Sequence, residues 1–316
     1  SAGGSSNRNT TDLTMSSDGG VIVSTDGAEI YISKDLGASW SGEGQSGKTW
    51  TGVTVSGDGK KIYASAGDGT IRKAENLATQ TITFNDPLDM TFGAADQAIT
   101  ASSSSGLTVT LASTTQSVCT IVSNSIRIVT AGTCTVTANQ AGNSVYAAAT
   151  QVSNNVTISK AASSITASGS TTFTYSGLPQ GPATSNPVGS AGAVTYSYVG
   201  VAPTSYTASA TKPTNAGSYS VTATVATDTN YLSASSAPYS FTISKSPLEI
   251  TASSPTVSYG ATKPTITASY VGLLNGDASS VVTGQSCDTV YTTTSPGGSL
   301  PATSCSGGTA TNYTIS

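Results

Sequence analysis

The sequence predicts an all-β fold, and three observations support this. Short runs rich in threonine and valine alternate apolar and polar residues, and clusters of Gly, Pro and Asn separate them. No stretch keeps a helical period over three turns, so we expect almost no helix. Two internal repeats, at offsets of 40 and 85 residues, indicate small β units arranged in tandem.

The composition excludes several classes of function. The chain has 316 residues and no histidine, and its 12 Lys and Arg face 16 Asp and Glu. Without histidine there is no Ser-His-Asp or Cys-His catalysis and no imidazole metal ligand. The acidic balance disfavours nucleic acid as a partner, and no apolar run approaches the roughly 20 residues of a membrane span. We therefore expect no enzyme and no catalytic, cofactor-binding or metal site.

Residues 1–77 differ from the rest of the chain, because they carry 16 of its 28 charged side chains. Within them, residues 15–24 align with residues 55–64, each with an S-x-D-G turn between short strands. A period near 40 residues with Asp-Gly turns is typical of β-propeller blades. Two blades cannot close a propeller, which needs about four to eight. The segment is thus either the last blades of a propeller that begins upstream or a short relic.

Between the two copies lies the pattern S-x-D-x-G-x-x-W, formed by Ser33, Asp35, Gly37 and Trp40. The carboxylate can accept backbone N–H groups within the turn, glycine allows a positive φ, and the tryptophan can pack back. The pattern resembles the Asp-box of sialidase-like propellers, which implies a structural role in closing a hairpin. A sialidase site is not expected, because the chain has only three arginines and no R-I-P signature. None of the four Asp-Gly pairs here fits a spaced calcium loop, so hairpin turns explain them better.

The 85-residue repeat is anchored at three places. Residues 131–138 align with 216–223, Tyr146 aligns with Tyr231, and residues 157–160 align with 242–245. Each unit has about the size of an immunoglobulin-like sandwich.

These residues also carry family resemblances. Residues 80–160, with the motif Ala131-Gly132-Thr133-Cys134, resemble the bacterial Ig-like repeats of large surface proteins. Residues 163–245, with Tyr175-Ser176-Gly177-Leu178-Pro179, resemble MBG domains, which are bacterial Ig-like relatives. From residue 247 onward, Tyr259-Gly260, residues 272–277 and residues 312–315 are similar to the YGX-type MBG domain.

The resemblances imply tandem Ig-like β-sandwiches preceded by β-propeller-type blades. The expected domains are partial Asp-box blades at 1–77, a bacterial Ig-like domain at 78–160, an MBG domain at 161–245 and a YGX-type MBG domain at 246–316. The joints at residues 160–162 and 245–247 are too short for free swinging, and Pro247 stiffens the second. Such a string would form a semi-rigid rod.

Four cysteines occur in two local pairs, and no histidine is present to complete a zinc site. Two disulfides in an oxidising compartment are the favoured interpretation, and four small buried thiols are the alternative. Within the Ig-like repeats, Cys134 replaces Tyr219 and is expected to reach Cys119 on a neighbouring strand, while Cys287 and Cys305 play the same part in the last unit.

The YGX-type pattern leads us to expect one more strand after residues 312–316. Its absence would leave a sheet edge that can pair with another chain, and a strand from a neighbouring subunit would then complete a fibre. The alternative is a boundary of the sequence at this point.

The expected function is a structural or adhesive segment of an extracellular protein on the bacterial cell surface, acting as a rod or fibre. Its partners would be further copies of itself or another cell-surface protein, with a glycan as a further candidate and no nucleic acid. The alternative is a carbohydrate-binding or glycoside-processing protein whose active propeller lies upstream.

Overall fold

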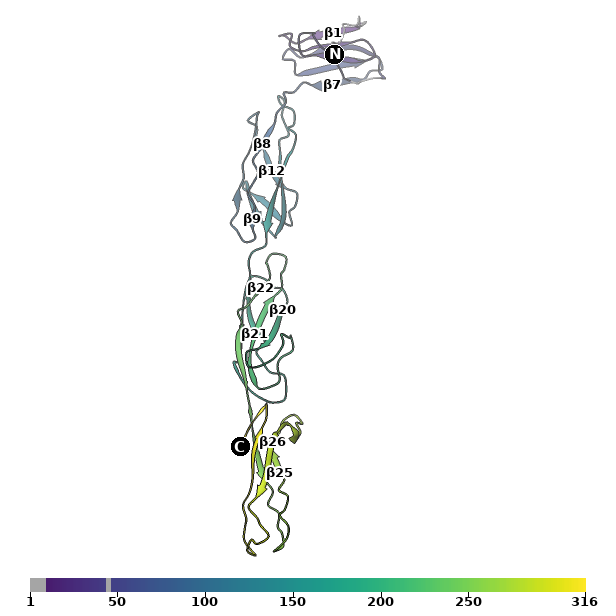
Figure 1. The fold of residues 1–316 in the computed structure, drawn as a ribbon. Helices are drawn as coiled ribbons and strands as arrows, with labels where there is room; N and C mark the ends of the chain where they lie inside the picture. The colour runs from purple at the N-terminus through teal and green to yellow at the C-terminus, as the bar shows by residue number, and fades with distance from the viewer. Residues whose placement is uncertain (1–9, 44–46) are drawn as a thin grey trace. The chain divides into compact units, whose positions relative to one another are not determined.

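The computed structural model describes residues 10–43 and 47–316 (Figure 1). The described residues form strands throughout, and the only helix among them is the single 3₁₀ turn η1 (Ser279–Val281). The all-β prediction is therefore confirmed. The chain divides into two compact units, one of residues 1–89, 95–129 and 133–157 and the other of residues 90–94, 130–132 and 158–316. The finer division into four domains stays a prediction.

The first part of the chain forms two antiparallel sheets whose strands follow chain order. One contains β1 (Asp12–Met15), β2 (Ile22–Thr25), β3 (Ile30–Ser33) and β4 (Ser41–Gly42), and the other contains β5 (Trp50–Val55), β6 (Lys61–Ala66) and β7 (Ile71–Glu75).

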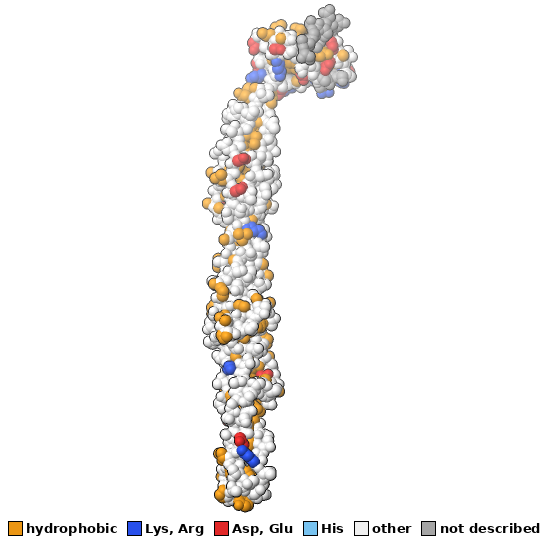
Figure 2. All heavy atoms as spheres, in the orientation of Figure 1, with side chains coloured by type: hydrophobic (Ala, Val, Ile, Leu, Met, Phe, Trp, Pro, Cys, Tyr) orange, Lys and Arg blue, Asp and Glu red, His pale blue; other side chains and the backbone are white. Residues whose placement is uncertain are grey.

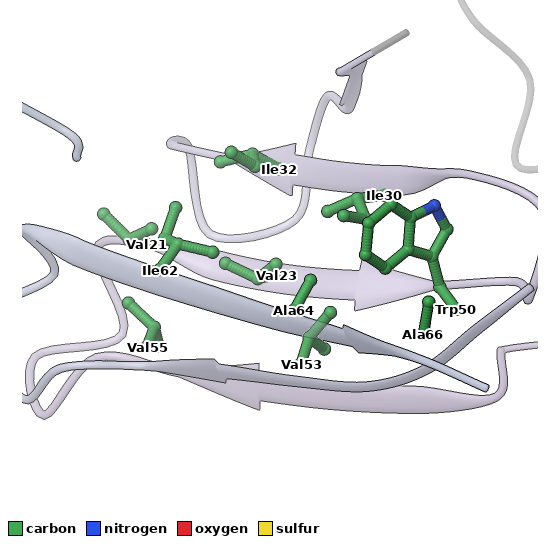
Figure 3. Packing of buried hydrophobic residues seen from close by; sticks show 10 residues of the cluster. All are labelled: Val21, Val23, Ile30, Ile32, Trp50, Val53, Val55, Ile62, Ala64 and Ala66. Carbon is green, nitrogen blue, oxygen red and sulfur yellow. The ribbon is translucent and has the colours of Figure 1, made fainter. Parts of the chain in front are cut away.

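Apolar side chains from both sheets point toward one another and form one cluster (Figure 3). Strand β6 buries every second residue, namely Ile62, Ala64 and Ala66. Trp50, at the start of β5, is fully buried in the same cluster. Alternation along the strands thus supplies a core to a segment that is otherwise rich in charge. Figure 2 shows that Lys, Arg, Asp and Glu side chains gather over β1–β7 and are sparse over the later strands.

Residues 78–160 form three small sheets. Their strand orders are β12 (Thr110–Ser113), β15 (Gly132–Asn139), β16 (Val152–Ser159) and β9 (Met90–Thr91); β10 (Gln97–Ala98), β14 (Ser125–Ile128) and β13 (Cys119–Val122); and β11 (Ala101–Ser103) with β8 (Ile82–Phe84). The β9–β16 pair is parallel, with Met90 opposite Ile158.

Residues 161–245 repeat the strand order of the four-stranded sheet of residues 78–160. The main sheet has the order β18 (Thr172–Thr174), β23 (Tyr239–Ser244), β21 (Gly217–Val225) and β20 (Val194–Gly200), with β22 (Ala234–Ser235) also on β21, and β17 (Ser164–Ser168) pairs with β19 (Thr184–Val188). Strand β18 is parallel to β23, with Phe173 opposite Ile243. Ile243 lies 85 positions after Ile158, and their partners Phe173 and Met90 lie 83 positions apart, so the sequence repeat recurs in the strand pairing with a small shift on one strand.

The last residues form a smaller set of strands. These are β24 (Ser246–Ala252), which lies between β25 (Ala268–Val271) and β28 (Tyr313–Ile315), and a pair made of β26 (Thr283–Thr289) and β27 (Thr303–Thr309). Strand β28 runs parallel to β24, with Tyr313 opposite Ser246. Leu248 and Tyr313 are buried in one cluster with Tyr219 and Phe241 of the preceding repeat.

Candidate functional site

The turn after β3 contains the four residues of the S-x-D-x-G-x-x-W pattern. Asp35 Oδ1 accepts a bond from the Ser33 hydroxyl at 2.8 Å and one from the Ser39 N–H at 2.8 Å. The Gly37 N–H donates to Ser33 Oγ at 2.9 Å, and Gly37 has a φ of 84°. The indole N–H of Trp40 donates to the Gly37 carbonyl at 3.1 Å. These residues therefore form one closed hydrogen-bonded turn between β3 and β4.

The hydrogen bonds around Asp35 favour its ionised form. The Ser39 hydroxyl contributes most, followed by the Ser39 N–H and the Ser33 hydroxyl, and together they lower the pKa of Asp35 to about 2. Similar bonds to serine hydroxyls or backbone N–H groups lower the pKa of Asp18, Asp26 and Asp58. In the first two sheets, carboxylates are thus used to fix turns.

Acid should loosen these turns. Because the pKa of Asp35 is lower in the folded chain than in the unfolded one, its stabilising effect is complete above about pH 4 and is lost as pH falls toward 2. We expect Asp35→Asn to reduce the pH dependence of unfolding between pH 4 and 2, followed by tryptophan fluorescence. Lys34→Gln is the matched control, since it removes a charge from the same turn. An Asp35→Asn profile that coincides with the wild-type profile would contradict this assignment.

The two S-x-D-G turns have one geometry. Ser16 Oγ donates to Asp18 Oδ1 at 2.6 Å and accepts from the Val21 N–H at 2.9 Å. Ser56 Oγ donates to Asp58 Oδ1 at 2.5 Å and accepts from the Lys61 N–H at 2.9 Å. Within residues 10–43 and 47–316, no group of three or more His, Cys, Asp or Glu side chains is placed to hold a metal ion.

Both predicted cysteine pairs are disulfides, but the two bridges differ. Cys287 and Cys305 lie opposite each other on the paired strands β26 and β27. Cys119 is on β13 and Cys134 is on β15, and these strands belong to different sheets. The expectation that Cys119 and Cys134 lie on neighbouring strands, and that the second bridge plays the same part, is therefore wrong. Cys134 occupies a fully buried position of β15, so its side chain meets the facing sheet rather than an adjacent strand.

Within the second unit, consecutive repeats meet through two nearly identical sets of contacts. In the first set, the Ala131 N–H donates to Asn230 Oδ1 at 2.9 Å, and the rings of Phe92 and Tyr231 pack edge to face at 5.4 Å. Lys160 Nζ also donates to the carbonyl of Asp228 at 2.5 Å. The contact thus combines a hydrogen bond to an asparagine side chain, a pair of packed rings and a hydrogen bond from a lysine to a backbone carbonyl.

The second set reproduces each of these contacts. The Ala216 N–H donates to Asn312 Oδ1 at 2.9 Å, and the rings of Tyr175 and Tyr313 pack edge to face at 5.3 Å. Lys245 Nζ donates to the carbonyl of Ala310 at 2.7 Å. We call Asn230–Tyr231 and Asn312–Tyr313 the Asn–Tyr pairs, and the ring and alanine N–H that they contact the receiving sites.

Backbone bonds within each repeat hold the Asn–Tyr pairs in place. The Ala161 N–H donates to the Asn230 carbonyl, and the Ser246 N–H donates to the Asn312 carbonyl, both at 2.9 Å. Ala161 and Ser246, which follow Lys160 and Lys245, thus fix the backbone of the two asparagines. Each asparagine therefore loses little further conformational entropy when its side chain binds the preceding repeat.

The second set of contacts is reinforced by a shared carboxylate. The hydroxyls of Tyr175 and Tyr313 both donate to Asp277 Oδ2, at 2.8 and 2.7 Å. Burial and this carboxylate raise the pKa of Tyr313 to about 12. Asn275 Nδ2 donates to the carbonyl of Gly177 at 2.8 Å, and a Cβ on Gly177 would lie 2.3 Å from Cβ of Asn275. Only glycine lets the two repeats approach this closely.

These contact residues were not predicted from the sequence. Tyr146 and Tyr231 align as repeat anchors, but the asparagine that precedes the tyrosine in two of the three copies was not assigned a role. The Asn-Tyr dipeptide, which lies shortly before β22 in one repeat and at the start of β28 in the next, is the signal that could have found them.

Removing one asparagine should weaken one set of contacts. Asn312→Ala leaves the Ala216 N–H without its acceptor, which costs on the order of 1 kcal/mol for a partly solvated bond. We expect faster hydrogen exchange at the Ala216 amide, measured by NMR. Asn230→Ala is the matched control, because it should act at Ala131 alone. Equal exchange at Ala216 in Asn312→Ala and in the wild type would show that the bond contributes nothing.

The last part of the chain can be compared with known protein families. In the described part of the chain no helix has the length and apolar character needed to span a membrane. No curated protein matches the chain. One family model does match, and it covers the strands from β24 to β28: residues 248–316 match the MBG domain (YGX type).

Proposed function

We propose that this chain is a structural and adhesive segment of an extracellular bacterial surface protein, with a mechanical rather than a catalytic role. The observation that carries the proposal is the repeated pair of contacts, in which Ala131 meets Asn230 and Ala216 meets Asn312. Tandem repeats that are held together by specific contacts at each joint can transmit force along an array. The MBG match and the two disulfides fit an extracellular location.

We further propose that a strand from a neighbouring subunit adds to β27. Strand β21 is paired on both sides, by β20 and β23. Strand β27 pairs with β26, and no second strand among the described residues pairs with it. An open strand edge offers backbone N–H and C=O groups to an incoming strand. Such addition would link copies of the chain into a fibre.

Electron microscopy of the full chain, together with hydrogen exchange, tests both parts. We expect filaments, in which the β27 amides that exchange rapidly in the dispersed protein become protected. A dispersed protein at every concentration, with β27 exchange unchanged, would contradict strand addition. Binding to a glycan array without filaments would instead favour the carbohydrate-binding alternative.

A further inference from the structure

Each receiving site consists of two groups on one repeat. The first is an aromatic ring directly after the short strand that runs parallel to the last strand, namely Phe92 after β9 and Tyr175 after β18. The second is the N–H of the alanine that precedes a long central strand, namely Ala131 before β15 and Ala216 before β21.

Residues 246–316 carry two groups at corresponding places in the sequence, although residues 256–258, before the ring, do not form a strand. Tyr259 follows Thr256-Val257-Ser258 as Tyr175 follows Thr172-Phe173-Thr174. Ala302 precedes β27 as Ala216 precedes β21, and a serine stands two positions after each alanine. The last repeat therefore has a ring and an alanine N–H at the positions that form a receiving site in the two repeats before it.

These two groups face solvent. Tyr259 is 73% exposed, whereas Tyr175, covered by the next repeat, is 5% exposed. Ala302 is exposed as well. A cavity of about 350 Å³ lies here, and Tyr259, Pro301 and Thr303 are among its lining residues. Leu300, at its rim, is 98% exposed. Exposed apolar side chains around a cavity that is also lined by the exposed ring of Tyr259 indicate an interaction surface.

Two positions differ between the copies, and neither blocks the contact. Ala261 stands where Gly177 follows Tyr175, but Ala94 occupies the same place after Phe92 in the first set of contacts, where the ring pair still forms. Thr303 follows Ala302, where glycine follows Ala131 and Ala216. A Cβ on Gly217 would collide with Thr204 Cγ2 and Oγ1 at 2.7 and 2.8 Å, which belong to its own repeat. The glycine is thus required by packing within that repeat and not by the approach of Asn312.

We infer that Tyr259 and Ala302 form a receiving site for the Asn–Tyr pair of a further Ig-like repeat in tandem. The Ala302 N–H donates to the incoming asparagine side chain, and the Tyr259 ring packs edge to face against the incoming tyrosine. The Tyr259 hydroxyl meets a carboxylate of the incoming repeat, as the Tyr175 hydroxyl meets Asp277. This inference concerns the end of the repeat and does not depend on strand addition at β27.

A second copy of this chain does not offer a suitable partner. Its pairs Asn230–Tyr231 and Asn312–Tyr313 are already engaged. The remaining counterpart is Val145–Tyr146, in which valine stands at the asparagine position and has no side-chain acceptor. The occupant is therefore another repeat that carries asparagine there.

An extended chain tests the inference. Residues 235–245 and then a second copy of residues 246–316 are added after Ser316, since Tyr313–Ser316 correspond to Tyr231–Ala234. We expect exchange at the Ala302 amide to slow about tenfold, as for a bond of roughly 1.4 kcal/mol. Asn→Ala at the added counterpart of Asn312 should restore fast exchange. A folded added repeat with an unchanged Ala302 amide would overturn the inference.

Two measurements on the unextended chain cover the case in which the added repeat does not fold. Exchange at Ala216 must accelerate in Asn312→Ala, and an unchanged rate would remove the basis of the receiving site. In sedimentation experiments, Tyr259→Ala must leave any self-association of the chain unchanged. The contrary result is self-association that Tyr259→Ala abolishes. Such an association would mean that a second copy occupies the site, and it would overturn the assignment to a tandem repeat.

Discussion

Trp50→Ala is expected to lower the free energy of unfolding of the first two sheets by about 3–5 kcal/mol. Trp50 is the largest fully buried side chain among the described residues, and its indole packs in the cluster shared by β2, β3, β5 and β6 (Figure 3). Truncation leaves a cavity that rigid strands cannot collapse to fill. Urea unfolding followed by the fluorescence of Trp40 measures the loss, because both tryptophans lie in this part of the chain.

Trp40→Ala is the matched control, with Trp50 as the remaining probe. Trp40 is only partly buried, so its removal should cost clearly less. If Trp50→Ala does not fold, Trp50→Phe should retain part of the stability. Equal losses for Trp40→Ala and Trp50→Ala would show that the cluster between the sheets is not the main source of stability.

Removing the Cys119–Cys134 bridge should destabilise residues 110–139 by about 3 kcal/mol. The cysteines are 15 positions apart, and closing a loop of this size limits the unfolded chain by about that amount in the chain-entropy model. Both cysteines are fully buried, and the bridge joins two sheets, so no hydrogen-bonded ladder replaces it. The double variant Cys119→Ala, Cys134→Ala should show faster hydrogen exchange across β12–β15.

Cys287→Ala with Cys305→Ala is the matched control and should leave exchange in residues 110–139 unchanged. Mild reductant gives a second readout. Cys287 and Cys305 are half-buried, so their bridge should be reduced before the fully buried Cys119–Cys134 bridge. Reduction in the opposite order would contradict the burial found for Cys119 and Cys134.

Local chemistry made some features predictable from the sequence. The turn at Ser33–Trp40 could be predicted because its hydrogen bonds join residues at most four positions apart. The all-β class followed from period-two alternation, which β6 shows as strictly alternating burial. The cysteine pairs followed from spacing, but the sheets that they join did not.

Features that depend on distant segments could not be predicted. The parallel pairing of β9 with β16 brings together residues 68 positions apart (90 and 158), and nothing near Met90 indicates it. The bond from Ala216 to Asn312 spans 96 positions and requires the paths of two repeats. Asparagine is also common in turns, so the role of the Asn-Tyr dipeptide becomes clear only when the asparagine side chain is seen to bind the preceding repeat.

The repeated contacts also have an evolutionary consequence. The Asn–Tyr pair and the receiving groups lie at different places on a repeat, so the contact is directional and does not close on itself. Duplication of residues 161–245 would therefore place an Asn–Tyr pair against a receiving site at the new junction, whereas duplication of residues 78–160 would place Val145–Tyr146 there. The length of such an array can change by recombination without redesign of the joint, provided that the added repeat carries asparagine before its tyrosine.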